Sequence, residues 1–259
     1  MRPAPAVLLA AGTLAVLAGC GGTSGRAHTT SGAHATAIPV VPAVVRMQGA
    51  RPAAAVTIPA PPIHQWPIPY GARRRQEMAA YSLRHYGEDT YRLTAPKVIV
   101  EHYTETAGAQ EAFNTFAPDV PDSEFHELPN TCAHFLVEPN GRIDQLVPLS
   151  LRCRHTTGLN WTAIGIENVG FSDQAILADK RQLDASLALT RWLRCRYGIA
   201  LKNVIGHNES LSSPYHHDRV PAFQHQTHSD WKHADMIRYR ALLARLPCAS
   251  AAAEGAPAP

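Results

Sequence analysis

Short apolar runs alternate along this chain with longer segments in which apolar residues recur at helical spacing. The short runs are rich in Val and Ile and predict buried strands, whereas the longer segments predict helices with one apolar face. The strands are expected at residues 97–103, 162–170 and 203–207, and the helices at residues 73–86, 111–116, 181–197 and 235–246. Strands that alternate with helices are typical of an α/β domain.

A hairpin is predicted at residues 135–147, where two apolar-rich arms flank Asn140-Gly141. Both residues tolerate positive φ angles, so the pair is a strong signal for a two-residue turn. An antiparallel hairpin among strands that are joined through helices gives a sheet of mixed direction. The predicted fold class is therefore α/β, a single domain with a central mixed β-sheet flanked by helices. Residues 104–131 are expected to include a loop that lines the substrate groove.

The two ends of the chain differ in composition from the part that holds these elements. Arg2 and the apolar segment after it predict a secretory signal peptide at residues 1–19, which is too short for a stable membrane span. Residues 20–62 are rich in Gly, Ser, Thr, Ala and Pro and predict a flexible tether, and residues 249–259 predict a disordered tail. The folded domain is therefore expected at residues 63–248.

The signal segment ends in Leu17-Ala18-Gly19-Cys20, which resembles a bacterial lipobox. A cysteine at that position is diacylated and becomes the new N-terminus, and each buried CH₂ of an acyl chain contributes about 0.8 kcal/mol to membrane binding. We therefore expect an exported protein that is anchored to the outer face of the cell membrane through lipid on Cys20. An ordinary signal peptide with a chance cysteine is the alternative.

Apart from Cys20, the chain holds four cysteines, at positions 132, 153, 195 and 248. An even number in an exported chain favours disulfides over free thiols, and no C-x-x-C spacing supports zinc–thiolate ligation. Four cysteines allow three pairings. We favour Cys132–Cys153, which joins neighbouring strand segments, and Cys195–Cys248, which ties a helix to the tail.

The formal net charge of +3 is small for a chain of 259 residues. The basic residues are scattered through the predicted helices, so the charge does not indicate a nucleic-acid partner. A mildly basic exported protein is compatible with anionic cell-wall polymers, although surface solvation accounts for the same charges.

Polar side chains stand at the carboxyl ends of the three predicted strands. His102 follows Val98-Ile99-Val100, Glu167 follows an apolar run that includes Ile166, and His207 follows another apolar run. Ligands of open α/β sheets gather at strand carboxyl ends, so these side chains are expected to converge on one site. A structural ion pair with an Arg is the alternative interpretation of Glu167.

Four motifs in this order give the chain from about Lys97 to Leu246 a family resemblance: VIVEHYT, AHFLVEPNGRIDQLVP, RHTTGLNWTAIGIE and VIGHNES. The region resembles the zinc-dependent N-acetylmuramoyl-L-alanine amidases, a family that includes phage lysozyme-type amidases, bacterial anhydromuropeptide amidases and animal peptidoglycan-recognition proteins. The resemblance implies the same α/β fold and Zn²⁺ as cofactor. It also implies peptidoglycan as substrate, cleaved between N-acetylmuramic acid and L-alanine for cell-wall turnover.

The resemblance also implies the metal ligands. A catalytic zinc site has three protein ligands and an open position for water. His102 and His207 match the two histidine ligands of the family, and Asp230 takes the position of the third. The sequence SLSSPYHHDRVPAFQ is inserted before Asp230, so His228 competes with it for the third ligand position.

The catalytic roles follow from the same matches. Glu167 is expected to act as general base, because an apolar setting raises the pKa of a carboxyl group. His228 takes the position of a Lys in the family and, together with His155, is expected to donate to the developing oxyanion. Of the other histidines, His134 either lines the groove or packs in the hairpin. Three remain ambiguous between adventitious metal binding and solvation: His216, His217 and His225.

Two other functions stay open. Some family members keep the groove but lose the zinc, so a non-catalytic peptidoglycan-binding module is one alternative, although the chain retains all three expected ligands and Glu167. A zinc hydrolase that acts on another amide is the second. The chain is expected to be a monomer without a nucleic-acid partner.

Overall fold

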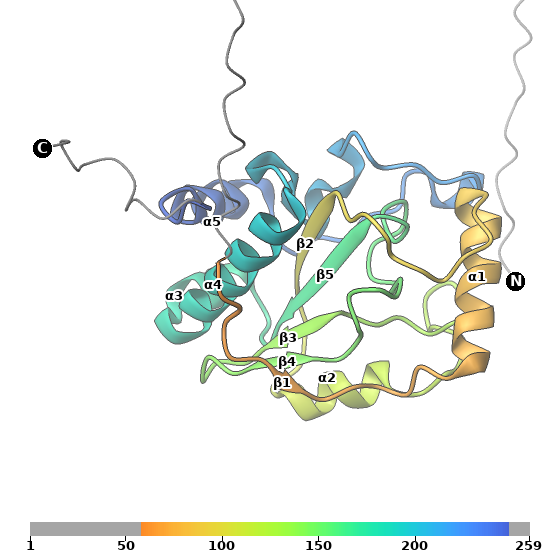
Figure 1. Ribbon diagram of the computed structural model, residues 1–259, viewed down its shortest axis with the longest axis horizontal. Helices are drawn as coiled ribbons and strands as arrows, with labels where there is room; N and C mark the ends of the chain where they lie inside the picture. Colours follow the sequence, from red (N-terminus) through yellow and green to blue (C-terminus); the bar gives the residue numbers. More distant parts are fainter. Residues whose placement is uncertain (1–57, 249–259) are drawn as a thin grey trace, which may run out of the picture. The chain divides into compact units, whose positions relative to one another are not determined.

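The strands lie in one sheet with the order β1-β4-β3-β5-β2-β6, in a computed structural model that describes residues 58–248 (Figure 1). Only the β3–β4 pair is antiparallel, so the sheet is mixed, as expected. The strands are β1 (His64–Gln65), β2 (Val98–Tyr103), β3 (Phe135–Val137), β4 (Ile143–Gln145), β5 (Ala163–Asn168) and β6 (Val204–Gly206). Outside the described residues lie the expected signal peptide with Cys20, residues 20–57 of the expected tether and the whole expected tail.

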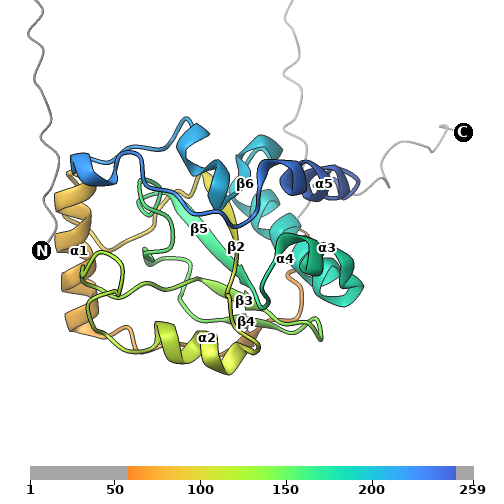
Figure 2. The same cartoon turned by 180° about the vertical axis from the view of Figure 1, so that it is seen from behind.

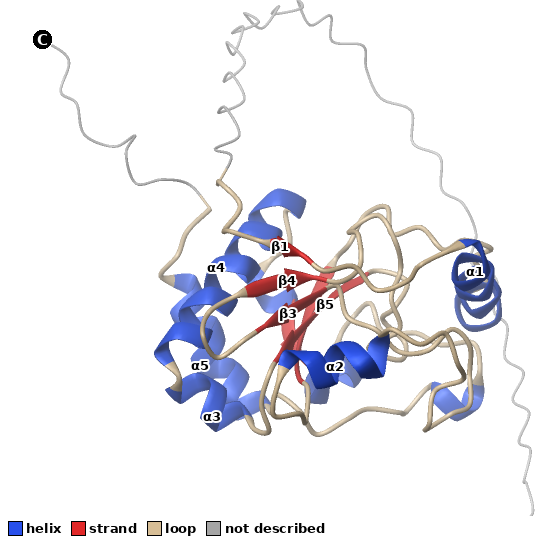
Figure 3. Ribbon diagram, turned by 90° about the horizontal axis from the view of Figure 1, so that it is seen from below, coloured by secondary structure: helices blue, strands red, loops and turns tan. Residues whose placement is uncertain are grey.

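Helices cover both faces of this sheet (Figure 3). They are α1 (Ala72–Tyr86), α2 (Ala109–Phe116), α3 (Asp173–Ala178), α4 (Lys180–Tyr197) and α5 (His233–Ala244). On one face, α4 and α5 pack Leu189 and Met236 against Ile164, because their apolar stripes face the β-branched strands. On the other face, α2 packs Ala112 against Leu136. None of the described helices is long and apolar enough to cross a membrane.

The structure confirms the predicted helices and core strands and differs in three places. The strand β1 and the helix α3 were not expected, because two and six residues are too short for a clear apolar period. The hairpin has a three-residue connection instead of a two-residue turn. Glu138 N donates to the carbonyl of Arg142, and only Gly141 of the connecting residues has a positive φ, of 85°.

Both expected disulfides are present. Cys132 is bonded to Cys153, with a Cα–Cα distance of 5.6 Å, and Cys195 is bonded to Cys248, with a Cα–Cα distance of 5.3 Å. The first joins the segment before β3 to the segment that carries His155, beside the carboxyl ends of the strands. The second ties the end of α4 to the segment that follows α5.

Candidate metal and catalytic site

The carboxyl ends of three parallel strands bring the predicted site residues together. In the register of β2 and β5, His102 lies opposite Glu167, so the two side chains project from the same face of the sheet. β6 lies on the other side of β2 (Figure 2). It ends at Gly206, so His207 follows it at the same edge of the sheet. The convergence that the strand pattern predicted is therefore confirmed by the strand register.

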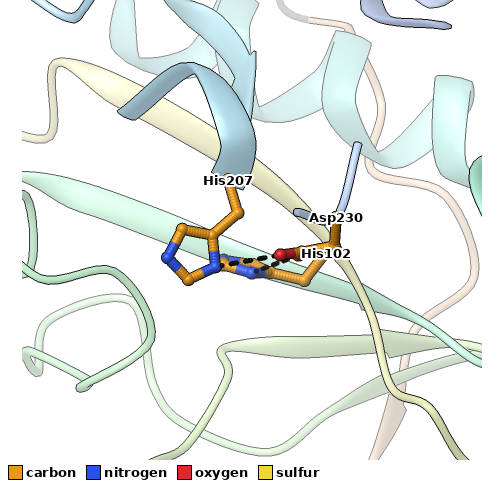
Figure 4. A group of neighbouring side chains, drawn as sticks. All are labelled: His102, His207 and Asp230. Carbon is orange, nitrogen blue, oxygen red and sulfur yellow. Dashed lines mark hydrogen bonds and ion pairs between the residues drawn. The ribbon is translucent and has the colours of Figure 1, made fainter. Parts of the chain in front are cut away.

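A cluster of His102, His207 and Asp230 is the candidate metal site, because it offers three ligand atoms that all lie within 4.8 Å of one another. Nδ1 of His102 lies 3.1 Å from one oxygen of Asp230, and Nδ1 of His207 lies 3.3 Å from the other. Figure 4 shows both rings turned toward the carboxylate. All three residues are buried.

Close backbone packing holds Asp230 in this cluster. A Cβ on Gly206 would lie 1.9 Å from the carbonyl oxygen of Trp231, so only glycine allows the segment after Asp230 to pass so near to β6. Trp231 N donates to the carboxylate of Asp173 at 2.8 Å, and the Trp231 indole donates to the carbonyl of His102 at 3.0 Å. The candidate ligand Asp230 is therefore anchored to β2, the strand that carries His102.

Hydrogen bonds also join the segment before Asp230 to the turn after β6. Asn208 N donates to the carbonyl of Asp230 at 2.9 Å, and the hydroxyl of Thr227 donates to the carbonyl of His207 at 2.8 Å. The inserted loop leaves and returns between these contacts. The insertion thus lengthens the chain between the ligands without separating them.

The donor set fits a zinc ion. Four ligands arranged as a tetrahedron at about 2.0–2.1 Å from zinc lie about 3.3 Å from one another, which agrees with the 3.1 and 3.3 Å between the ring nitrogens and the carboxylate of Asp230. Two imidazole nitrogens and one carboxylate are a common set for catalytic zinc.

Electrostatics favour an ionised carboxylate between the two rings. Burial opposes the charge of Asp230, but the hydrogen bonds from His102 and His207 outweigh it and hold the pKa of this carboxyl well below its usual range. Burial lowers the pKa of His207 to about 4, so its ring is neutral. For His102, burial acts in the same direction, but the hydrogen bond to Asp230 and the nearby carboxylates raise the net pKa.

Glu167 lies beside the cluster as a buried carboxyl group with one free oxygen. Its side chain lines the same cavity as the three candidate ligands, and Oε2 has no hydrogen-bond partner among the described residues. Burial raises its pKa to about 7, and no Arg or Lys is among the charges that act on it. The alternative of a structural ion pair therefore finds no support, and the group is set for proton transfer near neutral pH.

The two remaining predicted residues lie on opposite sides of the ligands. The ring of His228 stacks on His207 at 4.7 Å between centroids, is half-exposed, and places Nε2 3.0 Å from a carboxylate oxygen of Glu124. His228 therefore lines the cavity, whereas Asp230 takes the place among the clustered ligands. The ring of His155 lies behind His102, with Nδ1 3.2 Å from its Nε2.

A cavity of about 210 Å³ opens beside the candidate ligands, and one of about 70 Å³ adjoins it. The loop after α2 contributes Phe125 and Thr131 to these cavities, so the expected groove-lining loop is confirmed. Arg154, which sequence reasoning missed, holds this loop by donating to Asp122 at 3.0 Å and to the carbonyl of Glu127 at 2.8 Å. No local signal marks such a pair, because its members lie far apart in the sequence.

The other histidines of residues 58–248 lie outside the cluster of candidate ligands. His134 is fully buried immediately before β3, and its Nε2 donates to the carbonyl of Leu151 at 3.0 Å, which supports the packing interpretation. The inserted loop forms a separate contact with α1. There the buried ring of His85 lies between two carboxylates, 2.8 Å from Asp218 and 2.9 Å from Glu127.

A family model and several solved structures match part of the chain. The family model described as N-acetylmuramoyl-L-alanine amidase matches residues 92–231. Among curated proteins nothing matches the chain. Solved structures include an endolysin amidase, LysCS, from Clostridium intestinale URNW, with 21% identity over 54% of this chain and 78% of that chain and a TM-score of 0.37.

Two further solved structures match with similar scores. A mutant endolysin from Bacillus subtilis has 25% identity over 57% of this chain and 84% of its own, with a TM-score of 0.38. The amidase AmiD from E. coli has 27% identity over 45% of this chain and 50% of its own, with a TM-score of 0.35. The family model covers more than half of the chain and includes its site strands. The chain therefore belongs to the N-acetylmuramoyl-L-alanine amidase family and is a hydrolase of the bond between N-acetylmuramic acid and L-alanine in peptidoglycan.

Proposed function

We propose that this amidase cuts peptidoglycan with a Zn²⁺ ion held by His102, His207 and Asp230 and with Glu167 as general base. The observation that carries the proposal is the position of the Asp230 carboxylate, at 3.1 and 3.3 Å from two buried imidazole nitrogens. A second acid, Glu167, stands in register with His102 and keeps one oxygen free. A bound zinc ion supplies Lewis acidity toward the amide carbonyl and toward the attacking water.

Glu167 handles the proton in this reaction. Its carboxylate takes a proton from the water as the water attacks the amide carbon, and it passes that proton to the departing amine of L-alanine. A pKa of about 7 suits both steps, since the group loses and regains a proton near neutral pH. General acid–base catalysis of this kind contributes roughly a hundred- to ten-thousandfold in rate.

His228 is the proposed donor to the oxyanion that develops on the amide. It lies on the wall of the cavity that Glu167 and the candidate ligands share. The contact between its Nε2 and Glu124 orients the half-exposed ring over His207 and directs the N–H at Glu124. A developing oxyanion in the cavity would replace Glu124 as the acceptor of this N–H.

The proposed setting of the enzyme is the outer face of the cell membrane. The lipobox-like end of the signal segment supports a lipid anchor on Cys20, and the composition of residues 20–62 supports a flexible tether between membrane and cell wall. We propose that the monomer acts from this anchor on peptidoglycan during cell-wall turnover.

Mass spectrometry of purified muropeptides tests this function. Protein that lacks the signal segment and Cys20 is incubated with them, with and without a zinc chelator. The proposal expects intact stem peptides with a free L-alanine amine, lost with chelator and restored by zinc. Unchanged muropeptides that stay bound to the protein would instead indicate a peptidoglycan-binding module. Cleavage that chelator does not affect would refute the role of zinc.

A further inference from the structure

The ring of His155 forms a closed triangle of polar atoms with its neighbours. Its Nδ1 lies 3.2 Å from Nε2 of His102 and 2.9 Å from the hydroxyl of Thr156. The hydroxyl of Thr156 lies 3.3 Å from the same Nε2 of His102. The nitrogen of His102 in this triangle is the one that faces away from Asp230.

The proton on His155 is fixed by the other side of its ring. Nε2 of His155 lies 3.4 Å from the carbonyl oxygen of Ala163, and a carbonyl oxygen can only accept a hydrogen bond. Nε2 therefore carries the proton of the neutral ring, and Nδ1 has a lone pair. That lone pair, together with the oxygen of Thr156, accepts from Nε2–H of His102.

The chain around this triangle leaves the ring of His155 little freedom. The side-chain oxygen of Asn160 accepts from the backbone N–H groups of both His155 and Thr156, at 2.8 Å each. A Cβ on Gly165 would lie 2.6 Å from the ring of His155, so the ring lies directly on the backbone of β5. The position of the acceptor is thus set by the backbone on two sides.

We propose that His155 and Thr156 are positioning residues that keep a proton on Nε2 of His102, so that Nδ1 is the nitrogen that gives up its proton and binds a metal ion beside Asp230. This inference rests on the proposed zinc site. A ligand imidazole needs an acceptor for its other N–H, and removal of such a partner typically weakens metal binding roughly ten- to a hundredfold. Only His102 has this support, since Nε2 of His207 lacks a partner among the described residues.

The same contacts separate this role from oxyanion stabilisation. Nε2–H of His155 is directed at the carbonyl of Ala163, and Nδ1 is directed at His102 and Thr156. The ring therefore has no N–H left to donate to substrate in the cavity. His155 acts on the reaction through His102, and His228 remains the proposed donor.

Zinc affinity measured by competition with a fluorescent chelator tests the proposal, with the free energy of unfolding of the metal-free protein measured in parallel. Two variants remove an acceptor, Thr156→Val and His155→Phe, and each keeps the approximate shape of the side chain. Two matched variants keep an acceptor near the same place, Thr156→Ser and His155→Asn. The full set is compared with the unchanged protein, which retains both disulfides.

The proposal expects zinc affinity to fall roughly ten- to a hundredfold in Thr156→Val and His155→Phe and to recover to within about threefold in Thr156→Ser and His155→Asn. Unchanged affinity in the first pair would overturn it. Equal loss in the matched pair, at equal stability, would overturn it too, because packing would then be the cause. Failure of the unchanged protein to bind zinc would refute the proposed zinc site itself, which distinguishes the two claims.

Discussion

Replacement of Glu167 by Gln should stabilise the metal-free protein and should remove most of the activity of the zinc-loaded enzyme. Burial raises the pKa of Glu167 from 4.5 to about 7, because the charged form loses its hydration and the charge of His102 compensates only in part. Gln has nearly the same shape and no charge. The substitution therefore removes the cost of a buried carboxylate together with the proposed base.

The size of the effect follows from proton linkage. Between about pH 4.5 and 7 the unfolded state has lost the proton of Glu167 while the folded state still holds it, so the stability of the metal-free protein falls as the pH rises. At about 1.4 kcal/mol for each pKa unit, the full difference is about 3.5 kcal/mol. Glu167→Gln should thus match the unchanged protein near pH 4.5 and exceed its free energy of unfolding by up to about 3.5 kcal/mol at pH 8.

Urea unfolding of chelator-treated protein at both pH values, with the disulfides intact, measures this difference. Glu105→Gln is the matched control, because Glu105 lines the same cavity but is exposed, and it should change stability by less than about 0.5 kcal/mol. In the zinc-loaded enzyme, Glu167→Gln should lower kcat roughly a hundred- to ten-thousandfold and leave zinc affinity unchanged. Equal stability at pH 8 combined with retained kcat would refute the reasoning.

Three further outcomes follow from the structure. In urea unfolding, His85→Gln should destabilise the protein by about 3–5 kcal/mol at pH 5.5 and by less at pH 9. Burial lowers the pKa of His85, but Asp218 and Glu127 outweigh burial and raise it, and the stabilisation by the charged ring is lost as the pH rises through the raised pKa. Gly165→Ala should cost about 1–3 kcal/mol in the same assay and weaken zinc binding, because its Cβ would lie 2.6 Å from the ring of His155. Zinc at a hundred times its Kd should raise the free energy of unfolding by about 2.7 kcal/mol, and a chelator should reverse the shift in calorimetry.

The sequence allowed the strands of the site to be predicted because each is a short apolar run that ends in a polar side chain. Glu167 stood out for the same reason, since a carboxylate in a buried strand is rare. The strand register then confirmed that His102 and Glu167 lie side by side. The elements that escaped prediction, β1 and α3, have two and six residues and show no period of their own.

Contacts between distant segments could not be predicted from local pattern. Asp230, and not His228, lies in the cluster of candidate ligands. Its position there depends on the close packing of Trp231 on Gly206, two residues that the inserted loop separates in the sequence. The pair of His85 and Asp218 joins residues 133 positions apart. Local propensity carries no information on such pairs, because they form only once the sheet has placed the loops.

Anomalous diffraction at the zinc absorption edge, from crystals of the zinc-loaded protein, tests the central claim most directly. The account predicts one strong peak within about 2.0–2.2 Å of Nδ1 of His102, Nδ1 of His207 and a carboxylate oxygen of Asp230, with Glu167 nearby but not bound. A peak that is bonded to His228 in place of Asp230, or no peak among these residues, would contradict it.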